Sequence, residues 1–205
     1  MNIAVFASGR GTNFGAIIRA VKKGKIKANL SLLVCDNPKA GAIGRAKRAG
    51  IKIALVKRED FANKEDFAAK IIAHLEENKI DLIVLAGFMR LLTPEFVRRY
   101  AGRILNIHPA LLPSFKGTEA IKDALDYGVG VTGVTVHFVD EKIDHGPIIL
   151  QKAVQIQEDT LESLEKKMHK IEQYLYPEAI RLYVEGTLKL EGRKVRISNT
   201  SSNKC

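Results

Sequence analysis

Short apolar segments alternate with amphipathic segments along the first two thirds of the chain. Several apolar segments lack the polar alternation of a half-exposed strand, which indicates strands covered on both faces. These segments are residues 2–7, 30–35, 52–56, 82–86 and 103–107. Patterns typical of helices lie between them, at residues 13–23, 40–49, 64–78 and 94–100. We therefore expect an α/β fold, with a Rossmann-like, open, mostly parallel sheet and helices on both faces.

The last third has a different pattern. A helical pattern runs from residue 161 to about residue 185, and the remaining apolar segments are short and strand-like. We expect those strands at residues 133–139, 148–156, 188–190 and 194–197. No internal repeat or linker interrupts the chain, so residues 1–197 are predicted to form one domain. Residues 198–205 are small and polar, which predicts a disordered tail.

Composition narrows the class of protein without identifying it. With 46% hydrophobic and 27% charged residues, the chain is typical of a soluble globular protein. No apolar run reaches the roughly 18–20 residues of a membrane helix. The N-terminus enters a strand pattern directly, without a basic region and cleavage site, so we expect a cytoplasmic protein without a membrane partner.

Cysteines and histidines do not form a recognisable metal or disulfide pattern. The two cysteines, Cys35 and Cys205, are far apart and are expected to be free thiols. The five histidines do not cluster with acidic residues at the spacing of metal ligands, and His145 and His169 are interpreted as exposed residues. We therefore expect no metal.

The net charge of +10 raises the possibility of a nucleic-acid partner. The lysines and arginines, however, are spread along helical segments without interleaved aromatic residues, which favours a solvated surface. Positive potential would still attract anionic small substrates. We expect small-molecule substrates and no nucleic acid.

Candidate chemistry centres on Asn106 and His108, which lie two residues apart on a predicted strand. Side chains at this spacing face the same side, so both could donate to one carbonyl oxygen. Neither serine nor cysteine stands where it could attack with His108 as its base, which favours direct acyl transfer between two bound substrates. A carboxylate such as Asp144 beside the imidazole would favour its charged form and could relay a proton through water.

A glycine-rich turn follows the first predicted strand. Gly9 and Gly11 begin a dinucleotide-binding pattern, but Phe14 stands where the third glycine would be. The remaining feature is a tight turn into a helix, whose free N–H groups favour a phosphate. Thr12 and Asn13 offer cap-type side chains, and a plain helix cap is the alternative.

Four ordered motifs make the chain similar to phosphoribosylglycinamide formyltransferase, the folate-dependent enzyme of de novo purine synthesis. The motifs are ASGRGTNF from residue 7, LAGFMRLL from residue 85, NIHPALLP from residue 106, and residues 136–146. The resemblance runs from residue 1 to about residue 185. It implies the formyltransferase fold and transfer of a formyl group from 10-formyltetrahydrofolate, as co-substrate, to the amine of phosphoribosylglycinamide.

The resemblance also implies roles for individual residues. Asn106 and His108 would stabilise the oxyanion and Asp144 would assist proton transfer. The other implied positions divide into two ligand sites. Gly11, Thr12, Asn13, Asn106 and Glu172 would bind the glycinamide substrate. Lys64, Met89, Arg90, Leu91, Leu92, Val139, Asp140, Glu141 and Asp144 would bind the folate.

Some of these assignments have a competing structural interpretation or depart from the family pattern. On composition alone, Met89, Leu91 and Leu92 favour the core rather than a ligand site, and Glu172 favours a solvated helix face. Lys64 stands where relatives can carry arginine, so it keeps the charge but loses bidentate geometry.

Other functions remain open at this point. Another formyltransferase or a formyltetrahydrofolate deformylase would share the Asn106, His108 and Asp144 trio. A nicotinamide-binding Rossmann module is supported only by Asp36 after the second predicted strand, and a nucleic-acid-binding protein only by the net charge. A monomer and a homodimer are both compatible with the sequence.

Overall fold

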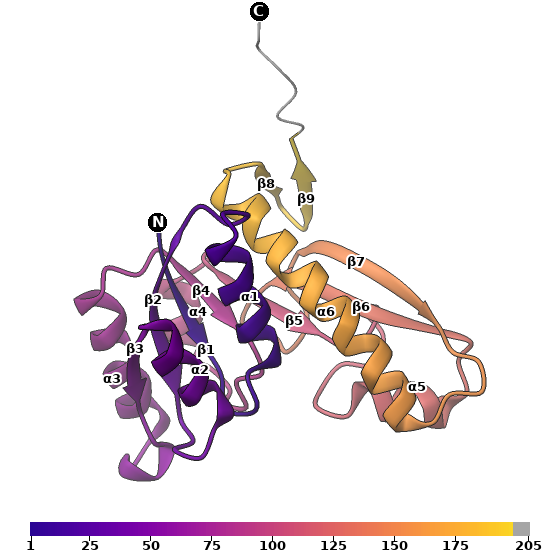
Figure 1. The fold of residues 1–205 in the computed structure, drawn as a ribbon, viewed down its shortest axis with the longest axis horizontal. Helices are drawn as coiled ribbons and strands as arrows, with labels where there is room; N and C mark the ends of the chain where they lie inside the picture. Colours follow the sequence, from indigo (N-terminus) through magenta and orange to yellow (C-terminus); the bar gives the residue numbers. More distant parts are fainter. Residues whose placement is uncertain (199–205) are drawn as a thin grey trace, which may run out of the picture.

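The computed structural model describes residues 1–198, and its strands form one nine-stranded sheet (Figure 1). The strand order is β3-β2-β1-β4-β5-β6-β7-β9-β8. The bounds are β1 Asn2–Phe6, β2 Asn29–Cys35, β3 Lys52–Leu55, β4 Leu82–Leu85, β5 Ile104–His108, β6 Val131–Phe138, β7 Ile148–Gln155, β8 Leu188–Glu191 and β9 Lys194–Ile197. The first five strands in this order, β3, β2, β1, β4 and β5, are parallel. Strand β6 is antiparallel to both its neighbours, β5 and β7.

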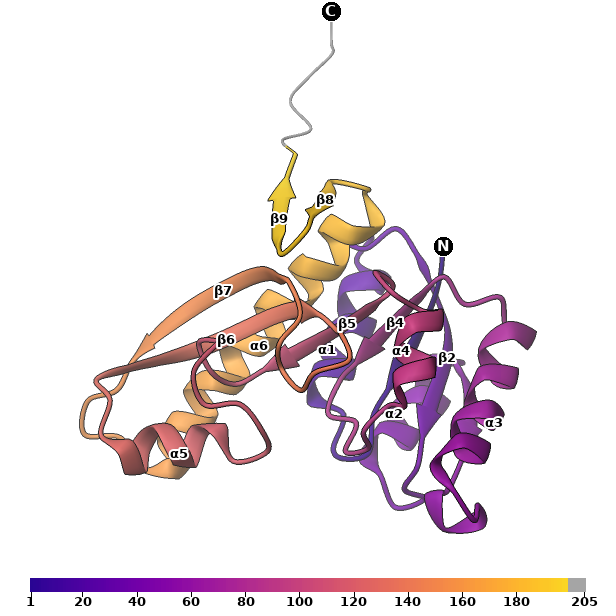
Figure 2. The same ribbon diagram turned by 180° about the vertical axis from the view of Figure 1, so that it is seen from behind.

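Helices cover both faces of the sheet (Figures 1 and 2). The bounds are α1 Thr12–Lys22, α2 Gly41–Ala49, η1 Arg58–Asp60, α3 Lys64–Glu77, α4 Pro94–Arg99, α5 Ala120–Tyr127 and α6 Leu161–Val184. Apolar residues of α1, α2 and α6 pack in one core cluster, and those of α3 and α4 pack in a second. The predicted fold class is therefore confirmed.

Differences from the predicted elements are small and local. The hydrophobic pattern does not single out η1 or α5, because a helix this short buries only a few side chains. The tail was expected to be disordered from residue 198, but the Ser198 N–H donates to the Thr187 carbonyl (2.8 Å), extending the hairpin by one residue. The rest of that prediction, residues 199–205, lies outside the described residues.

Helix α6 crosses the sheet and is tied to it by Tyr176. Its buried hydroxyl oxygen lies 2.8 Å from the Leu85 carbonyl and 2.9 Å from the Leu105 carbonyl. Burial raises the pKa of Tyr176 well above its ordinary value, so the phenol keeps its proton for these acceptors. The contact joins α6 to β4 and β5 next to the residues of the candidate site.

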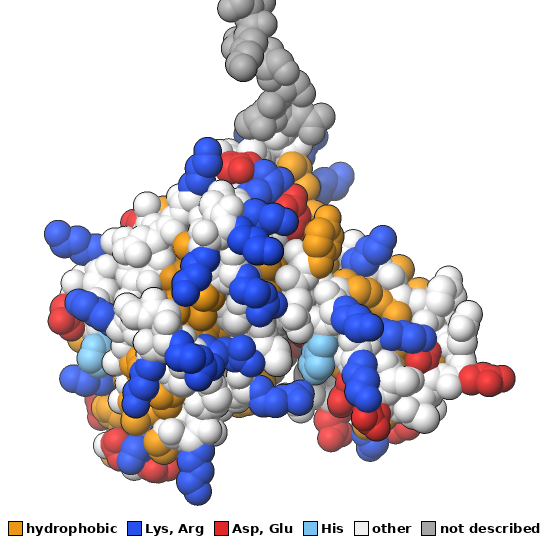
Figure 3. Space-filling view, in the orientation of Figure 1, with side chains coloured by type: hydrophobic (Ala, Val, Ile, Leu, Met, Phe, Trp, Pro, Cys, Tyr) orange, Lys and Arg blue, Asp and Glu red, His pale blue; other side chains and the backbone are white. Residues whose placement is uncertain are grey.

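The basic residues are distributed over the surface. Lysine and arginine side chains lie among polar and apolar ones across the face that carries α1, α2 and α6 (Figure 3). Among the described residues, no helix is long and apolar enough to span a membrane.

Candidate active site

The pairing of β5 with β6 sets the candidate catalytic side chains. Leu105 and Ile107 pack in the cluster under α6, so the alternate residues Asn106 and His108 face the other side of the sheet. In the antiparallel register Asn106 is opposite His137, and His108 is opposite Thr135. The predicted common orientation of Asn106 and His108 is therefore confirmed.

Asp144 completes the cluster from the loop between β6 and β7. Its Oδ1 lies 3.4 Å from Asn106 Nδ2, and its Oδ2 lies 3.4 Å from His108 Nδ1. The Gly117 N–H donates to the same Oδ2 at 3.0 Å. Asp144 has φ +45°, a conformation that a non-glycine residue adopts only when its surroundings hold it. The loop thus places the carboxylate between the amide and the imidazole.

His137 is a residue of this cluster that the sequence argument did not assign. Its Nδ1 donates to the Phe138 carbonyl (2.7 Å), and its Nε2 lies 3.3 Å from Asn106 Nδ2. Burial lowers the pKa of His137, so the neutral ring accepts a hydrogen bond from Asn106 at Nε2. The strand also carries Thr132 and Thr135, so a polar residue at position 137 did not by itself distinguish His137.

The second ring nitrogen of His108 also has a partner. Nε2 donates to the Phe115 carbonyl at 2.7 Å, while Nδ1 faces Asp144. Phe115 has φ +49° and lies in the loop that leads into α5. The His108 side chain is almost fully buried under this loop.

The start of α1 forms a separate polar site with α6. Gly11 has φ +68°, and a Cβ there would come within 2.9 Å of Ala42, so only glycine fits this turn. No side chain caps the helix, which leaves its first N–H groups free to bind an anion. The cap alternative is therefore not realised by Thr12 or Asn13.

Glu172 faces the start of α1. Asn13 Nδ2 donates to Glu172 Oε2 at 3.1 Å, and Asn13 Oδ1 is buried without a partner in the described residues. Glu172 is only 6% exposed, so its interpretation as a solvated acid is wrong: α6 packs against α1 here. A buried acceptor without a donor indicates room for a ligand group.

Two histidines interpreted as exposed are partly buried and paired. The side chains of His145 and His169 are 34% and 32% exposed. His169 Nδ1 donates to Glu172 Oε2 at 3.0 Å, and its Nε2 lies 3.5 Å from Arg10 Nη2. The hydrogen bond to Glu172 raises the pKa of His169. Sequence spacing does not show the contacts of His169 with Arg10 or of His145 with Arg193, because these partners are distant in the chain.

Comparison with known proteins identifies the family of this chain. Residues 1–180 match the family described as formyl transferase. A phosphoribosylglycinamide formyltransferase of Bacillus subtilis is 46% identical over 179 residues, covering 87% of this chain and 92% of that protein. One of Haemophilus influenzae is 42% identical over 190 residues, covering 92% and 90%. The chain belongs to the phosphoribosylglycinamide formyltransferase family.

A solved structure of this family extends the agreement to the fold. The crystal structure of glycinamide ribonucleotide transformylase 1 from Symbiobacterium toebii has a TM-score of 0.94 and 42% identity. The match covers 97% of this chain and 94% of that one. The formyltransferase fold expected from the resemblance is therefore confirmed.

All residues assigned to the folate site except Lys64 lie in two loops, residues 87–92 and 139–144. Met89 and Leu91 are 66% and 65% exposed, so a core position is wrong for both, while Leu92 packs partly in the second core cluster. Val139 packs against the same cluster as Leu92. Both loops are thus anchored on one core cluster, and the 87–92 loop presents apolar side chains to the solvent.

Polar contacts hold these loops in place. Arg90 Nε donates to Asp36 Oδ2 at 2.6 Å, so Asp36 supports the 87–92 loop in this structure. Arg98 Nη1 donates to Glu141 Oε2 at 2.9 Å, which ties the 139–144 loop to α4. Lys64 begins α3, is exposed, and within residues 1–198 makes no hydrogen bond or ion pair with the other assigned residues.

The convergence of His108, His137 and Asp144 also invites comparison with a metal site. Within the part of the chain that the structure describes, no group of three or more histidine, cysteine, aspartate or glutamate residues is arranged to hold an ion.

Proposed function

We propose that this protein transfers the formyl group of 10-formyltetrahydrofolate directly to the amine of 5′-phosphoribosylglycinamide in de novo purine biosynthesis. The observation that carries the proposal is the convergence of Asn106, His108 and Asp144 at the end of β5. Among the described residues, no serine or cysteine side chain bonds to His108, which favours direct attack over an acyl-enzyme.

The amine attacks the formyl carbon and produces a tetrahedral oxyanion, which needs preorganised donors. Asn106 Nδ2 supplies one hydrogen to His137, and its second hydrogen points toward Asp144 over a long 3.4 Å contact. That second hydrogen is weakly bound and is therefore the one offered to the oxyanion. His137 keeps the amide in this orientation.

His108 supplies the second donor. Asp144 lies beside Nδ1 and orients the ring, and Nε2 is the nitrogen that remains for the substrate. The attacking amine must also lose a proton, and Asp144 can receive it, directly or through water. When the tetrahedral intermediate collapses, the bond between the formyl carbon and the folate nitrogen breaks, and this nitrogen takes up the proton as tetrahydrofolate leaves. The Phe115 carbonyl now occupies Nε2, so the 113–119 loop must release His108 when the formyl donor binds.

The glycinamide substrate is held at α1. Its phosphate binds the free N–H groups of Gly11, Thr12 and Asn13 at the helix N-terminus, where the helix dipole favours an anion. Glu172 accepts from the ribose hydroxyls or the amine, and the unpartnered Asn13 Oδ1 accepts from the substrate as well. The amine end then points toward His108.

The folate is held by the 87–92 and 139–144 loops. Exposed Met89 and Leu91 contact the flat pterin ring, and backbone groups of Arg90, Leu92 and residues 139–144 read its polar edge. Lys64 is exposed and offers a charge to the glutamate carboxylates. Contact between the two bound substrates supplies several kcal/mol of the acceleration.

A spectrophotometric assay of folate product tests the proposal. Purified protein is given 10-formyltetrahydrofolate with phosphoribosylglycinamide, and the control omits the glycinamide. Product only in the complete mixture supports transfer to that amine. Product in the control identifies a deformylase, and no product in either mixture refutes the assigned substrates.

A further inference from the structure

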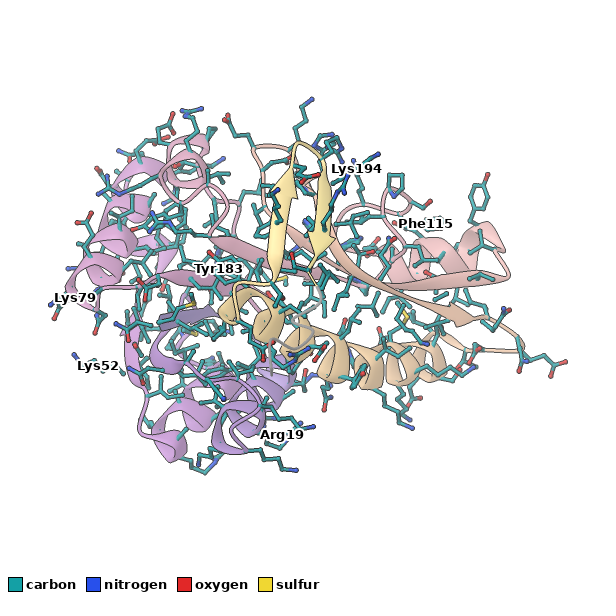
Figure 4. The ribbon with its side chains drawn as sticks, turned by 90° about the horizontal axis from the view of Figure 1, so that it is seen from above. Arg19, Lys52, Lys79, Phe115, Tyr183 and Lys194 are labelled. Carbon is teal, nitrogen blue, oxygen red and sulfur yellow. The ribbon has the colours of Figure 1, made fainter. Side chains whose placement is uncertain are left out.

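Arg193 lies outside the region that the formyl transferase family covers, which ends at residue 180. It lies in the two-residue turn between β8 and β9, in a hairpin that starts beside the end of α6. Seen from above, the hairpin crosses from α6 toward the opposite face, with Lys194 near its end (Figure 4). Lys194 pairs with Ile148 of β7, which brings Arg193 next to the loop that ends at Pro147.

Arg193 contacts the residue that follows Asp144. Its Nη2 donates to the His145 carbonyl at 2.7 Å, and its Nη1 lies 3.2 Å from His145 Nε2. The same Nη1 lies 3.2 Å from His145 Nδ1, which donates to Asp140 Oδ2 at 2.6 Å. Arg193, His145 and Asp140 therefore form a continuous chain from the hairpin to the start of the 140–144 turn.

Asp140 is held as an anion by this chain. Burial acts to raise the pKa of Asp140, but the hydrogen bonds from His145 and the Lys142 N–H, with the charges of His145 and Arg193, lower it overall. The Lys142 N–H donates to Asp140 Oδ1 at 3.0 Å, so both carboxylate oxygens are engaged. Asp140 thus fixes the first residue of the 140–144 turn, and His145 fixes the chain directly after its last residue.

The turn needs such a clamp because its backbone is strained. Asp144 has φ +45°, a strained conformation that persists only when the surrounding structure enforces it. A Cβ at Gly146 would lie 1.9 Å from the Phe138 carbonyl oxygen, so the chain crosses β6 closely just after Asp144. Between Asp144 and Gly146, the His145 carbonyl is the group that Arg193 holds.

We propose that Arg193 is a positioning residue for formyl transfer, acting through His145 to hold the 140–144 turn and its Asp144 carboxylate. The inference rests on the proposed function, in which this turn carries Asp144 and part of the folate site. The hairpin beyond the catalytic sheet thereby becomes part of the apparatus that sets the formyl donor against His108. Within residues 1–198, no hydrogen bond or ion pair joins the hairpin to Gly11, Thr12 or Asn13, so binding at the start of α1 is expected to be unaffected.

The test compares four purified variants with wild type: Arg193→Met, Arg193→Lys, His145→Ala, and the double variant Arg193→Met/His145→Ala. Arg196→Met is the matched control, because Arg196 lies on the same hairpin and pairs with Glu191 (2.8 Å) rather than with the turn. Each protein is assayed for kcat and for KM of both substrates, and its melting temperature is recorded.

We expect Arg193→Met to lower kcat/KM for the formyl donor about tenfold, while KM for the glycinamide stays within about twofold. For Arg193→Lys, kcat/KM for the formyl donor should lie between the wild-type value and that of Arg193→Met. Lysine keeps the charge but cannot hold the carbonyl and the ring of His145 together. The double variant should lose less activity than the product of the two single effects. His145→Ala removes the ring contact with Arg193 but leaves the carbonyl that Arg193 also holds, so the two residues share part of one chain of contacts.

Two results would overturn the inference. Arg193→Met could match Arg196→Met in every constant, or it could lower the melting temperature and the active fraction without changing KM for either substrate. Absence of formyl transfer in the wild-type protein would refute the proposed function instead, so the two failures are distinguishable.

Discussion

Replacing His137 by phenylalanine isolates the orientation of Asn106 from its chemistry. The wild-type ring accepts from Asn106 Nδ2 at 3.3 Å and donates to the Phe138 carbonyl at 2.7 Å. Phenylalanine retains an aromatic ring at this buried position but provides neither interaction. Asn106 remains in the protein, free to rotate or to turn both hydrogens toward Asp144.

The expected decrease in kcat of His137→Phe lies between two limits. Removing one oxyanion donor costs about 10²–10³ in rate, and losing one neutral hydrogen bond costs roughly 0.5–1.5 kcal/mol. Because the donor is present but poorly oriented, we expect kcat to fall about 10- to 100-fold with little change in either KM. The Phe138 carbonyl loses its donor as well, which lowers the free energy of unfolding by about 1–3 kcal/mol.

The pH dependence of stability checks the protonation state of His137. Burial lowers the pKa of His137 from its ordinary value of 6.5. Its neutral folded form therefore stabilises the protein above pH 6.5, and this contribution is lost as the pH falls toward the lowered pKa. Urea unfolding of wild type between pH 7.5 and about pH 5 should show this loss, and His137→Phe should show less of it.

Steady-state kinetics with each substrate in excess measures the catalytic part of the prediction. Thr132→Val, a buried change on the same strand, is the matched control for folding of β6. A His137→Phe enzyme with wild-type kcat would refute the argument that His137 orients Asn106. A loss confined to KM for the folate would show instead that the position shapes the donor site.

Four other substitutions give direct readouts. Asn106→Ala and Asp144→Asn should each lower kcat about 100-fold or more while changing substrate binding little, as measured by kinetics and calorimetry, and near-normal turnover in both would refute the mechanism. Thr132→Val should raise the free energy of unfolding by up to about 1 kcal/mol in urea, because its buried hydroxyl has no partner in the described structure; a clear loss would contradict this. The raised pKa of His169 beside Glu172 stabilises the folded protein fully below pH 6.5, and this stabilisation is lost as the pH rises through the folded value. Glu172→Gln should remove that pH dependence and raise KM for the glycinamide, and an unchanged stability profile would count against the pairing.

The fold class could be predicted because burial on both faces leaves a local record. Strands such as β4 are apolar at consecutive positions, and amphipathic helices such as α1 lie between them. Asn106 and His108 could also be paired from sequence, since alternate residues of one strand share a face. Glycine at position 11 indicated a turn into a helix for the same local reason.

Contacts between elements were not available from these patterns. His137 meets Asn106 through the β5–β6 register, and Glu172 meets Asn13 because α6 packs on α1. Exposure of Met89 and Leu91 also depends on the loops that surround them, not on their own polarity. Each of these facts requires the relative placement of segments far apart in the chain.

The sequence by itself determined the α/β alternation and the family, and it singled out Asn106, His108 and Asp144 as the candidate catalytic residues. Periodicity and motif spacing are properties of neighbouring residues, so they survive without coordinates. Only the tertiary structure decided that His137 orients Asn106, that the Phe115 carbonyl covers His108, and that Arg193 reaches the turn beside Asp144. These contacts arise from packing between distant segments, where position in space, rather than position along the chain, determines which atoms meet.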